Sequence, residues 1–382
     1  MHNYKLPLQR LSNCIRVLAA DAVEKASSGH PGMPMGFADV FTVLALKFLK
    51  FDPKQPRHPN RDRLVLSAGH GSMLLYAFYY LAGYKDFTLE DIKNFRQLHS
   101  KTPGHPEYGA YPAIETTTGP LGQGFATSVG MALAAKKRKD AHKVYCIVGD
   151  GCLMEGLSYE AASLAGHLSL NNLIILFDDN QITIDGSTEL SVSENHLKKF
   201  EAMGFAVEQI DGHNFDEINA SLSRANESSK PYFIACRTRI GWGAPIKSGS
   251  ENSHGAPLGE EEVAGLKKSI GFKDEPFYIP GDLLEIWRGI GKDLPKATEE
   301  QRGAILRFSG TEEINPEATR VSSGKILASL MEKNHQIIAG SADLSFSNNI
   351  KSKISKVIHR GDFDGNFMHY GTRESAMSSI MN

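Results

Sequence analysis

The sequence has no apolar run of membrane-spanning length, and its first residues lack the apolar stretch of a secretory signal peptide. Its four cysteines have no metal-site spacing. Cys146 and Cys236 lie within apolar runs, as is typical of buried thiols in a reducing compartment. The net charge of −2 argues against a general nucleic-acid binder. We therefore expect a cytoplasmic protein that binds neither membranes nor nucleic acid.

Apolar runs alternate with helical patterns along most of the 382 residues. Five runs predict strands, at 63–66, 144–148, 173–177, 205–210 and 232–237. Other stretches carry apolar residues at helical spacing, among them 8–22 and 35–49. Strands that alternate with helices predict an α/β fold, in which a parallel sheet has helices on both faces.

A polar stretch at 293–315 predicts a linker between a first domain, 1–292, and a second α/β domain, 316–382. In the second domain we expect a helix to residue 333, strands at 335–340 and 366–370, and a helix that begins near 374. About 65 residues are too few to bury a sizeable parallel sheet. We therefore expect the second domain to be incomplete, a truncated part of a larger unit.

The sequence Gly149-Asp150-Gly151 follows the apolar run 144–148, and Asn180 follows the run 173–177. The 30 residues between Asp150 and Asn180 span one helix and one strand, so both side chains should lie at the same edge of the sheet. Carboxylate and amide oxygens suit Mg²⁺, whose remaining ligands come from water and phosphate. Two ordinary turns at strand ends would use the same residue types. The spacing nevertheless favours a site that binds magnesium and a diphosphate.

Nine dispersed motifs, in order, resemble those of one enzyme family. They are Ser28-Gly29-His30-Pro31-Gly32, Ser67-Ala68-Gly69-His70-Gly71-Ser72, Thr102-Pro103-Gly104-His105, Thr118-Gly119-Pro120-Leu121-Gly122-Gln123-Gly124, Gly149-Asp150-Gly151-Cys152, Asp178-Asp179-Asn180, Ser253-His254-Gly255-Ala256-Pro257-Leu258, Gly340-Ser341-Ala342-Asp343-Leu344 and Gly371-Thr372-Arg373-Glu374. On these motifs the chain resembles the N-terminal part of transketolases. The resemblance implies a thiamine-diphosphate-binding fold, with a diphosphate-binding domain at 1–292 and the start of a pyrimidine-binding domain at 316–382.

The resemblance also implies an activity. Transketolases transfer a two-carbon ketol unit from a ketose phosphate to an aldose phosphate in the pentose phosphate pathway. They use thiamine diphosphate and Mg²⁺, or Ca²⁺ or Mn²⁺ in its place. The implied partners are sugar-phosphate substrates and a second copy of the chain in a homodimer.

Roles carry over to matching residues only by this resemblance. The metal ligands would be Asp150, Asn180 and the main-chain carbonyl of Ile182. The cofactor would be bound by His70, Gly119, Leu121, Gly149, Asp150, Gly151, Asn180, His254 and Asp343. The substrate would be bound by His30, His105, His254, Arg320 and Ser347, the last two at its phosphate.

Catalysis would rest on Glu374, His30 and His254, with Glu374 bonded to the aminopyrimidine ring of the cofactor. Glu160 resembles a residue that relays between the two sites of a dimer, although a solvated glutamate on a helix face is an equal reading. Thr372 and Ser375 depart from the isoleucine and histidine usual in the family beside the catalytic glutamate. This departure puts local packing around Glu374 in question.

Alternatives to transketolase remain open from the sequence. Deoxyxylulose-phosphate synthase and dihydroxyacetone synthase are related enzymes, and the motifs at 102–105 and 253–258 favour transketolase over the first. A catalytically inactive remnant that serves as a dimerisation module is a rival of another class. So is one subunit of a split enzyme, completed by a second polypeptide. We expect the 382-residue chain alone to lack activity.

Overall fold

A computed structural model describes residues 7–298 and 316–382. Its centre is a five-stranded sheet in the order β1-β2-β3-β7-β6, and every neighbouring pair is parallel. The strands are β1 (Arg63–Leu66), β2 (Val144–Gly149), β3 (Leu173–Asp179), β6 (Ala206–Asp211) and β7 (Tyr232–Arg237). Their positions match the five predicted strands within two residues, and the predicted α/β class is confirmed.

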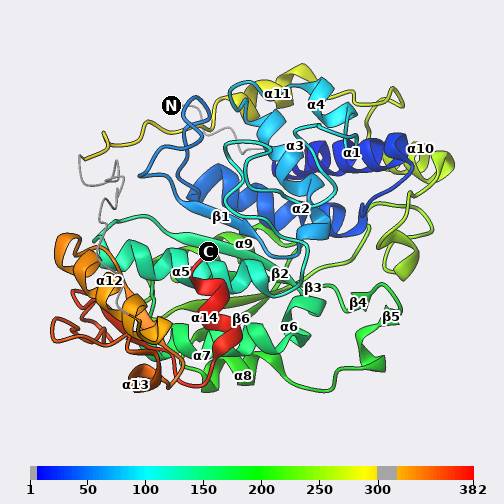
Figure 1. Cartoon of the computed structure of the whole chain (residues 1–382). Coiled ribbons are helices and arrows are strands. Elements are labelled where there is room, and N and C mark those ends of the chain that lie inside the picture. The colour runs from blue at the N-terminus through cyan, green and yellow to red at the C-terminus, as the bar shows by residue number, and fades with distance from the viewer. Residues whose placement is uncertain (1–6, 299–315) are drawn as a thin grey trace.

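Helices cover both faces of the sheet (Figure 1). One layer contains α1 (Leu8–Ala26), α2 (Gly32–Val43) and α3 (Met73–Leu81), and the opposite layer contains α5 (Gln123–Lys137), α7 (Gly156–Leu168) and α8 (His196–Ala202). The remaining helices of the first part are α4 (Leu89–Lys93), α6 (Asp150–Met154), α9 (Phe215–Glu227), α10 (Glu260–Ser269) and α11 (Gly281–Arg288). The helix predicted at 35–49 is α2 followed by a π-helical turn, Leu44–Phe48.

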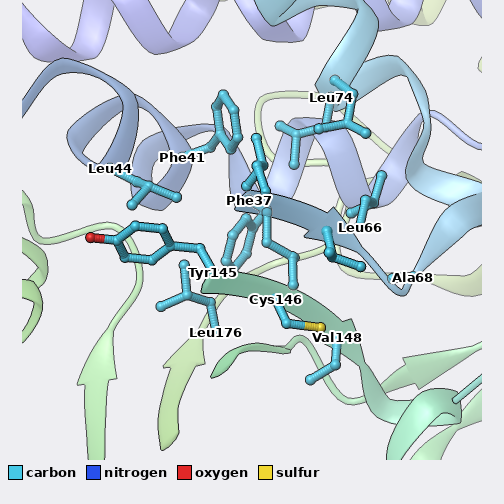
Figure 2. Close-up of a cluster of buried hydrophobic side chains, with 14 of the residues drawn as sticks. Phe37, Phe41, Leu44, Leu66, Ala68, Leu74, Tyr145, Cys146, Val148 and Leu176 are labelled. Atoms are coloured by element: carbon cyan, nitrogen blue, oxygen red, sulfur yellow. The ribbon is translucent and has the colours of Figure 1, made fainter. Parts of the chain in front are cut away.

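The centre of the sheet is apolar on both faces. The residues of β2 from Val144 to Val148 are all buried, as in a parallel strand covered by helices on each side. Figure 2 shows Phe37 and Phe41 of α2 together with Leu66 of β1 and Tyr145 of β2 in one buried cluster. This close packing fixes the positions of the strands. The polar side chains at their carboxyl ends are therefore held in defined positions.

The second part is smaller. It contains α12 (Thr319–Lys333), β8 (Ala339–Ser341), α13 (Ser345–Asn348), β9 (Phe367–His369) and α14 (Glu374–Ile380), and β8 pairs with β9 in parallel. The strand predicted at 335–340 starts only at Ala339, because the Asn334 side chain accepts a hydrogen bond from the Gln336 amide and forms a turn. Residues 293–298 of the predicted linker form no helix or strand, and 299–315 lie outside the described residues.

The helix α14 packs against α5 and α7 of the first part. It lies so close to α5 that a Cβ atom at Gly130 would be 2.1 Å from the Ile380 carbonyl oxygen. The Ala376 amide donates to Glu160 Oε2 at 2.8 Å, and Ser379 Oγ lies 2.6 Å from Gln123 Oε1. The two parts therefore share an interface with defined polar contacts.

None of the helices in residues 7–298 and 316–382 combines the length and the apolar character needed to cross a membrane.

Candidate active site

A cavity of about 270 Å³ lies at the carboxyl ends of the central strands. Its lining includes ten of the residues predicted for the site: His30, His70, Gly119, Leu121, Gly149, Asp150, Gly151, Asn180, Ile182 and His254. These residues come from six separate stretches of sequence, which only the fold brings together.

The register of the sheet explains why Asp150 and Asn180 meet. Gly149 of β2 pairs with Asp178 of β3, so Asp150 lies one residue and Asn180 two residues beyond the paired strand ends. The chain then reverses through a short hairpin, β4 (Ile182–Thr183) and β5 (Gly186–Ser187), which brings Ile182 to the cavity. Gln181 adopts a left-handed conformation, with φ 62°, at this reversal.

Asp150 is a buried carboxylate without a full set of partners. Its Oδ2 atom is buried and accepts no hydrogen bond from the described residues. Burial raises its pKa to about 8, and the nearby Asp179 and Asp178 carboxylates add to the rise. A cation beside Asp150 would remove this electrostatic cost.

Asp178 and Asn180 form a small network beside it. Asp178 accepts hydrogen bonds from Thr238 Oγ1 and from Asn180 Nδ2, the latter at 2.8 Å. Burial raises the pKa of Asp178 to about 7. The Ile182 amide donates to Asn180 Oδ1 at 3.0 Å, which leaves that oxygen a second lone pair. The network therefore fixes the amide with its oxygen available as a ligand.

These residues fit a hard divalent cation and a diphosphate. An orphaned carboxylate oxygen and an amide oxygen are the ligand types that Mg²⁺ takes. No cluster of three or more His, Cys, Asp or Glu suited to a metal occurs in 7–298 or 316–382, so other oxygens would have to complete the coordination. Gly149 offers room for them, since a Cβ there would have only Ala68 Cβ within 4 Å, at 3.8 Å.

The glycine-rich turn before α5 supplies another wall. Gly119 and Gly122 have φ values of 141° and 81°, in the region that favours glycine. A Cβ at Gly151 would lie 2.9 Å from Leu121 Cδ1, so this turn and the start of α6 touch. The glycines are thus required by backbone conformation and by close packing.

Four histidine rings lie close together; three of them, His30, His70 and His254, line the cavity, and His105 lies beside His30 outside the lining. The His30 ring centroid is 5.3 Å from His70, 6.0 Å from His105 and 5.9 Å from His254, and His70 stacks on His254 at 5.0 Å. Burial, with smaller contributions from the neighbouring histidines and, for His30, from Arg96, lowers the pKa of His30 to about 4 and that of His70 to about 3. Burial also lowers the pKa values of His105 and His254. All four rings are therefore neutral at pH 7, and each can donate one hydrogen bond and accept another.

The predicted residues of the second part lie outside this cavity. Asp343, Ser347, Arg320 and Glu374 are exposed, and none of them lines it. Asp343 has φ 64° just after β8, Ser347 is in α13, and Arg320 is near the start of α12, which contacts α13. The helices that carry Arg320 and Ser347 thus contact each other, and the convergence of the two side chains stays a prediction.

Glu374 is the first residue of α14, and the Glu160 carboxylate bonds the amide two residues later. Thr372 and Ser375, which flank Glu374, are exposed like Glu374 itself. Neither is part of the core of this chain. One chain therefore presents two separate groups of predicted site residues, one in the cavity and one around α12 to α14.

Six lining residues had been given no role in the site: Met33, Cys152, Asp178, Thr183, Ile184 and Ile240, although Cys152 and Asp178 belong to the motifs. Asp178 had a usable signal, because it stands at the end of the same apolar run that precedes Asn180. Ile184 and Ile240 had none, since isolated isoleucines in loops carry no positional information.

Comparisons with known proteins agree with this geometry. A family profile described as "Transketolase, thiamine diphosphate binding domain" matches residues 8–326. A transketolase of Cereibacter sphaeroides is 47% identical over 406 residues, which cover 98% of this chain and 62% of that protein. The structure of transketolase from Leishmania mexicana is similar with a TM-score of 0.90 and 38% identity, over 98% of this chain and 62% of that one. A Pichia stipitis transketolase solved in complex with sedoheptulose-7-phosphate gives a TM-score of 0.88 and 36% identity, with the same coverage.

The chain thus spans 62% of the length of these relatives. The family profile covers most of the chain, from the start of α1 into α12. Together with the cavity at the strand ends, this match shows that the chain belongs to the transketolase family.

Proposed function

We propose that the chain acts in ketol transfer, moving a two-carbon unit from a ketose phosphate to an aldose phosphate, with thiamine diphosphate and Mg²⁺ (or Ca²⁺ or Mn²⁺). The observation that carries the proposal is the buried, unpartnered Asp150 oxygen beside the fixed Asn180 amide, in a cavity shared with neutral histidines. The proposal places this reaction in the pentose phosphate pathway and the protein in the cytoplasm, as expected for a member of the transketolase family. Because the chain spans 62% of their length, the proposal concerns the complete enzyme.

Asp150, Asn180 and the Ile182 carbonyl would hold the metal, Gly149 would leave room for the diphosphate, and Gly151 would line the same end of the cavity. His70, Gly119, Leu121 and His254 would line the rest of the cofactor. When bound, thiamine diphosphate supplies the carbon nucleophile that makes and breaks the carbon–carbon bond. The protein's own part is to bind, orient and exclude water.

The histidines would handle the sugar. His30 and His254 would contact the hydroxyls and the reacting carbons, and His105 would contact the terminal hydroxyl of the donor. Neutral imidazoles suit this work, because each can give a proton at one nitrogen and accept one at the other. Burial keeps them neutral at the pH where the enzyme would act.

The second group of residues would serve the site of another copy in a homodimer. Glu374 would bond the aminopyrimidine, Asp343 would support the cofactor, and Arg320 and Ser347 would bind the substrate phosphate. Exposed apolar residues next to each group support this arrangement: Ile184 at the cavity is 63% exposed, and Phe346 beside Ser347 is 94% exposed. A partner copy would cover them.

Glu160 would position Glu374, because its carboxylate bonds the start of α14. In this scheme residues 1–292 form the diphosphate-binding domain, 293–315 the linker and 316–382 the start of the pyrimidine-binding domain.

The test is a ketol-transfer assay with xylulose 5-phosphate as donor, an aldose phosphate as acceptor, and saturating thiamine diphosphate and Mg²⁺. The chain is assayed alone and together with a polypeptide that covers the remaining length of the Cereibacter sphaeroides relative. Turnover on the order of 1–10³ per second in either mixture would support the proposal. Tight cofactor binding without turnover in both mixtures would point to a binding module instead.

A further inference from the structure

Arg96 lies between the two loops that carry His30 and His105. Its Nη1 donates to Ser28 Oγ at 3.0 Å, and its Nη2 lies 3.4 Å from His30 Nδ1. The guanidinium also packs against the other loop, since a Cβ at Gly104 would be 3.0 Å from Arg96 Cζ. The side chain therefore contacts both loops at once.

The backbone of Arg96 is held in an unusual conformation. Its φ is 62°, and its amide donates to the Thr102 carbonyl at 2.9 Å, which closes the loop before Gly104. A non-glycine residue in this region is strained unless the surrounding structure holds it. In this conformation the guanidinium lies beside His30.

No carboxylate compensates this cation. Among residues 7–298 and 316–382 no carboxylate pairs with Arg96; burial lowers the pKa of its guanidinium, and its Nε is buried without a hydrogen-bond partner. A partly buried guanidinium without a carboxylate partner gains little stability from its position. Its positive charge is also not neutralised, so it acts on the neighbouring imidazole of His30.

The chemistry of the two groups restricts the proton on His30. A guanidinium only donates hydrogen bonds, so the His30 nitrogen that faces it must accept. We propose that Arg96 is a positioning residue that fixes His30 as the neutral tautomer with its proton on Nε2. The ring then offers the cavity a hydrogen-bond donor of defined position.

The surroundings of His30 agree with this assignment. Nε2 makes no hydrogen bond to any described residue and lies 3.4 Å from the position of a Cβ at Gly255, on the side of the neighbouring His254. The titratable and charged groups that face the ring are His70, His105, His254 and Arg96. None of them is an acid that would favour the charged imidazolium, and the pKa of His30 is lowered to about 4.

The functional consequence rests on the proposed role of His30 toward the sugar hydroxyls. In that role Arg96 would make His30 a donor to a substrate oxygen. Loss of Arg96 would then leave a mixture of donor and acceptor rings in the site.

The test is ¹⁵N NMR of the histidine rings of the 382-residue chain, with the His30 signals assigned by His30→Gln. In the wild type at pH 7 we expect a neutral His30 with the proton on Nε2. In Arg96→Met, which keeps the stem but removes every donor, the Nδ1-protonated form should appear and the pKa should rise. Arg288→Met is the matched control, because Arg288 packs on an aromatic ring, Tyr80, and against a glycine, Gly83, and bonds no histidine.

A His30 proton on Nδ1 in the wild type, or unchanged His30 signals in Arg96→Met, would overturn the inference. If Arg96→Met does not fold, Gly104→Ala decides, since the added Cβ displaces the guanidinium while keeping its charge. A shift toward the Nδ1-protonated form in that variant supports the inference, and its absence overturns it. The ring signals do not depend on turnover, so an inactive protein with the proton on Nε2 would refute the proposed function alone.

Discussion

Gly130 is a position where one added methyl group should disturb the second group of site residues. It lies inside α5, where replacing glycine by alanine ordinarily stabilises a helix by about 1 kcal/mol. In this protein a Cβ at Gly130 would be 2.1 Å from the Ile380 carbonyl oxygen. Because that atom is backbone, a rotamer change cannot relieve the overlap. Gly130→Ala should therefore push α14 away from α5.

The cost can be worked from the contacts that α14 would lose. Ile380 is 7% exposed, and uncovering such a side chain costs about 1.5–3 kcal/mol. The hydrogen bond from the Ala376 amide to the Glu160 carboxylate adds about 1.5–3 kcal/mol. A partial displacement of α14 would lose only part of this stabilisation. Overpacking of a core typically costs about 1–3 kcal/mol. The expected net effect is destabilisation by about 1–2 kcal/mol, opposite in sign to helix propensity.

Hydrogen exchange of the α14 amides and urea unfolding measure the effect. Exchange at residues 374–380 should accelerate in Gly130→Ala, and the free energy of unfolding should fall. Gly156→Ala is the matched control, because a Cβ there meets nothing within 4 Å. It should leave both readouts unchanged within about 0.5 kcal/mol. A Gly130→Ala protein as stable as wild type, with unchanged α14 exchange, would refute the tight packing of α5 on α14.

Three further predictions concern the site itself. Asp150→Ala should abolish Mg²⁺-dependent binding of thiamine diphosphate, measured by calorimetry in an assembly that binds it, and equal affinity would contradict the metal-ligand assignment. Arg320→Ala should lower kcat/KM for phosphorylated acceptors by about 1.5–3 kcal/mol while unphosphorylated aldehydes are little affected; equal losses would make Arg320 structural. His30 and His70 stay neutral when folded, with pKa values of about 4 and 3, but take up protons near 6.5 when unfolded. The free energy of unfolding should therefore fall as pH drops from about 6.5 toward 4. In urea titrations His70→Gln should make this dependence on pH less steep, and an unchanged dependence would contradict the burial argument.

Much of the sheet could be predicted because its strands are continuous apolar runs. The runs 144–148 and 173–177 are buried on both faces, so their continuous apolar pattern predicted buried parallel strands. The ends of these strands then placed Asp150 and Asn180 at one edge of the sheet. Boundaries set by local turns were harder. The run at 337–338 is apolar but forms no strand, because the Asn334 turn shifts β8 to Ala339.

The contacts that orient side chains could not be read from the sequence. Arg96 stands in a polar stretch and has no periodic signal, and its place beside His30 depends on a bond to the Thr102 carbonyl. Glu160 likewise looks like any glutamate on a helix until α14 is packed against it. Such features depend on packing between elements that are distant in sequence, which residue patterns do not encode.

The main hydrophobic cluster does not stop at the predicted linker. It runs from Leu11 of α1 through the sheet to Met368, Tyr370 and Ile380 of the second part. The two parts should therefore melt together in one calorimetric transition rather than two. A fragment ending at residue 292 would expose the surface of α5 around Gly130, against which α14 packs, and the apolar residues beside it. Such a fragment would be prone to aggregate. The linker that the composition predicts thus does not divide the protein into two units that unfold independently. Any shortened version of this protein should keep α14 together with α5.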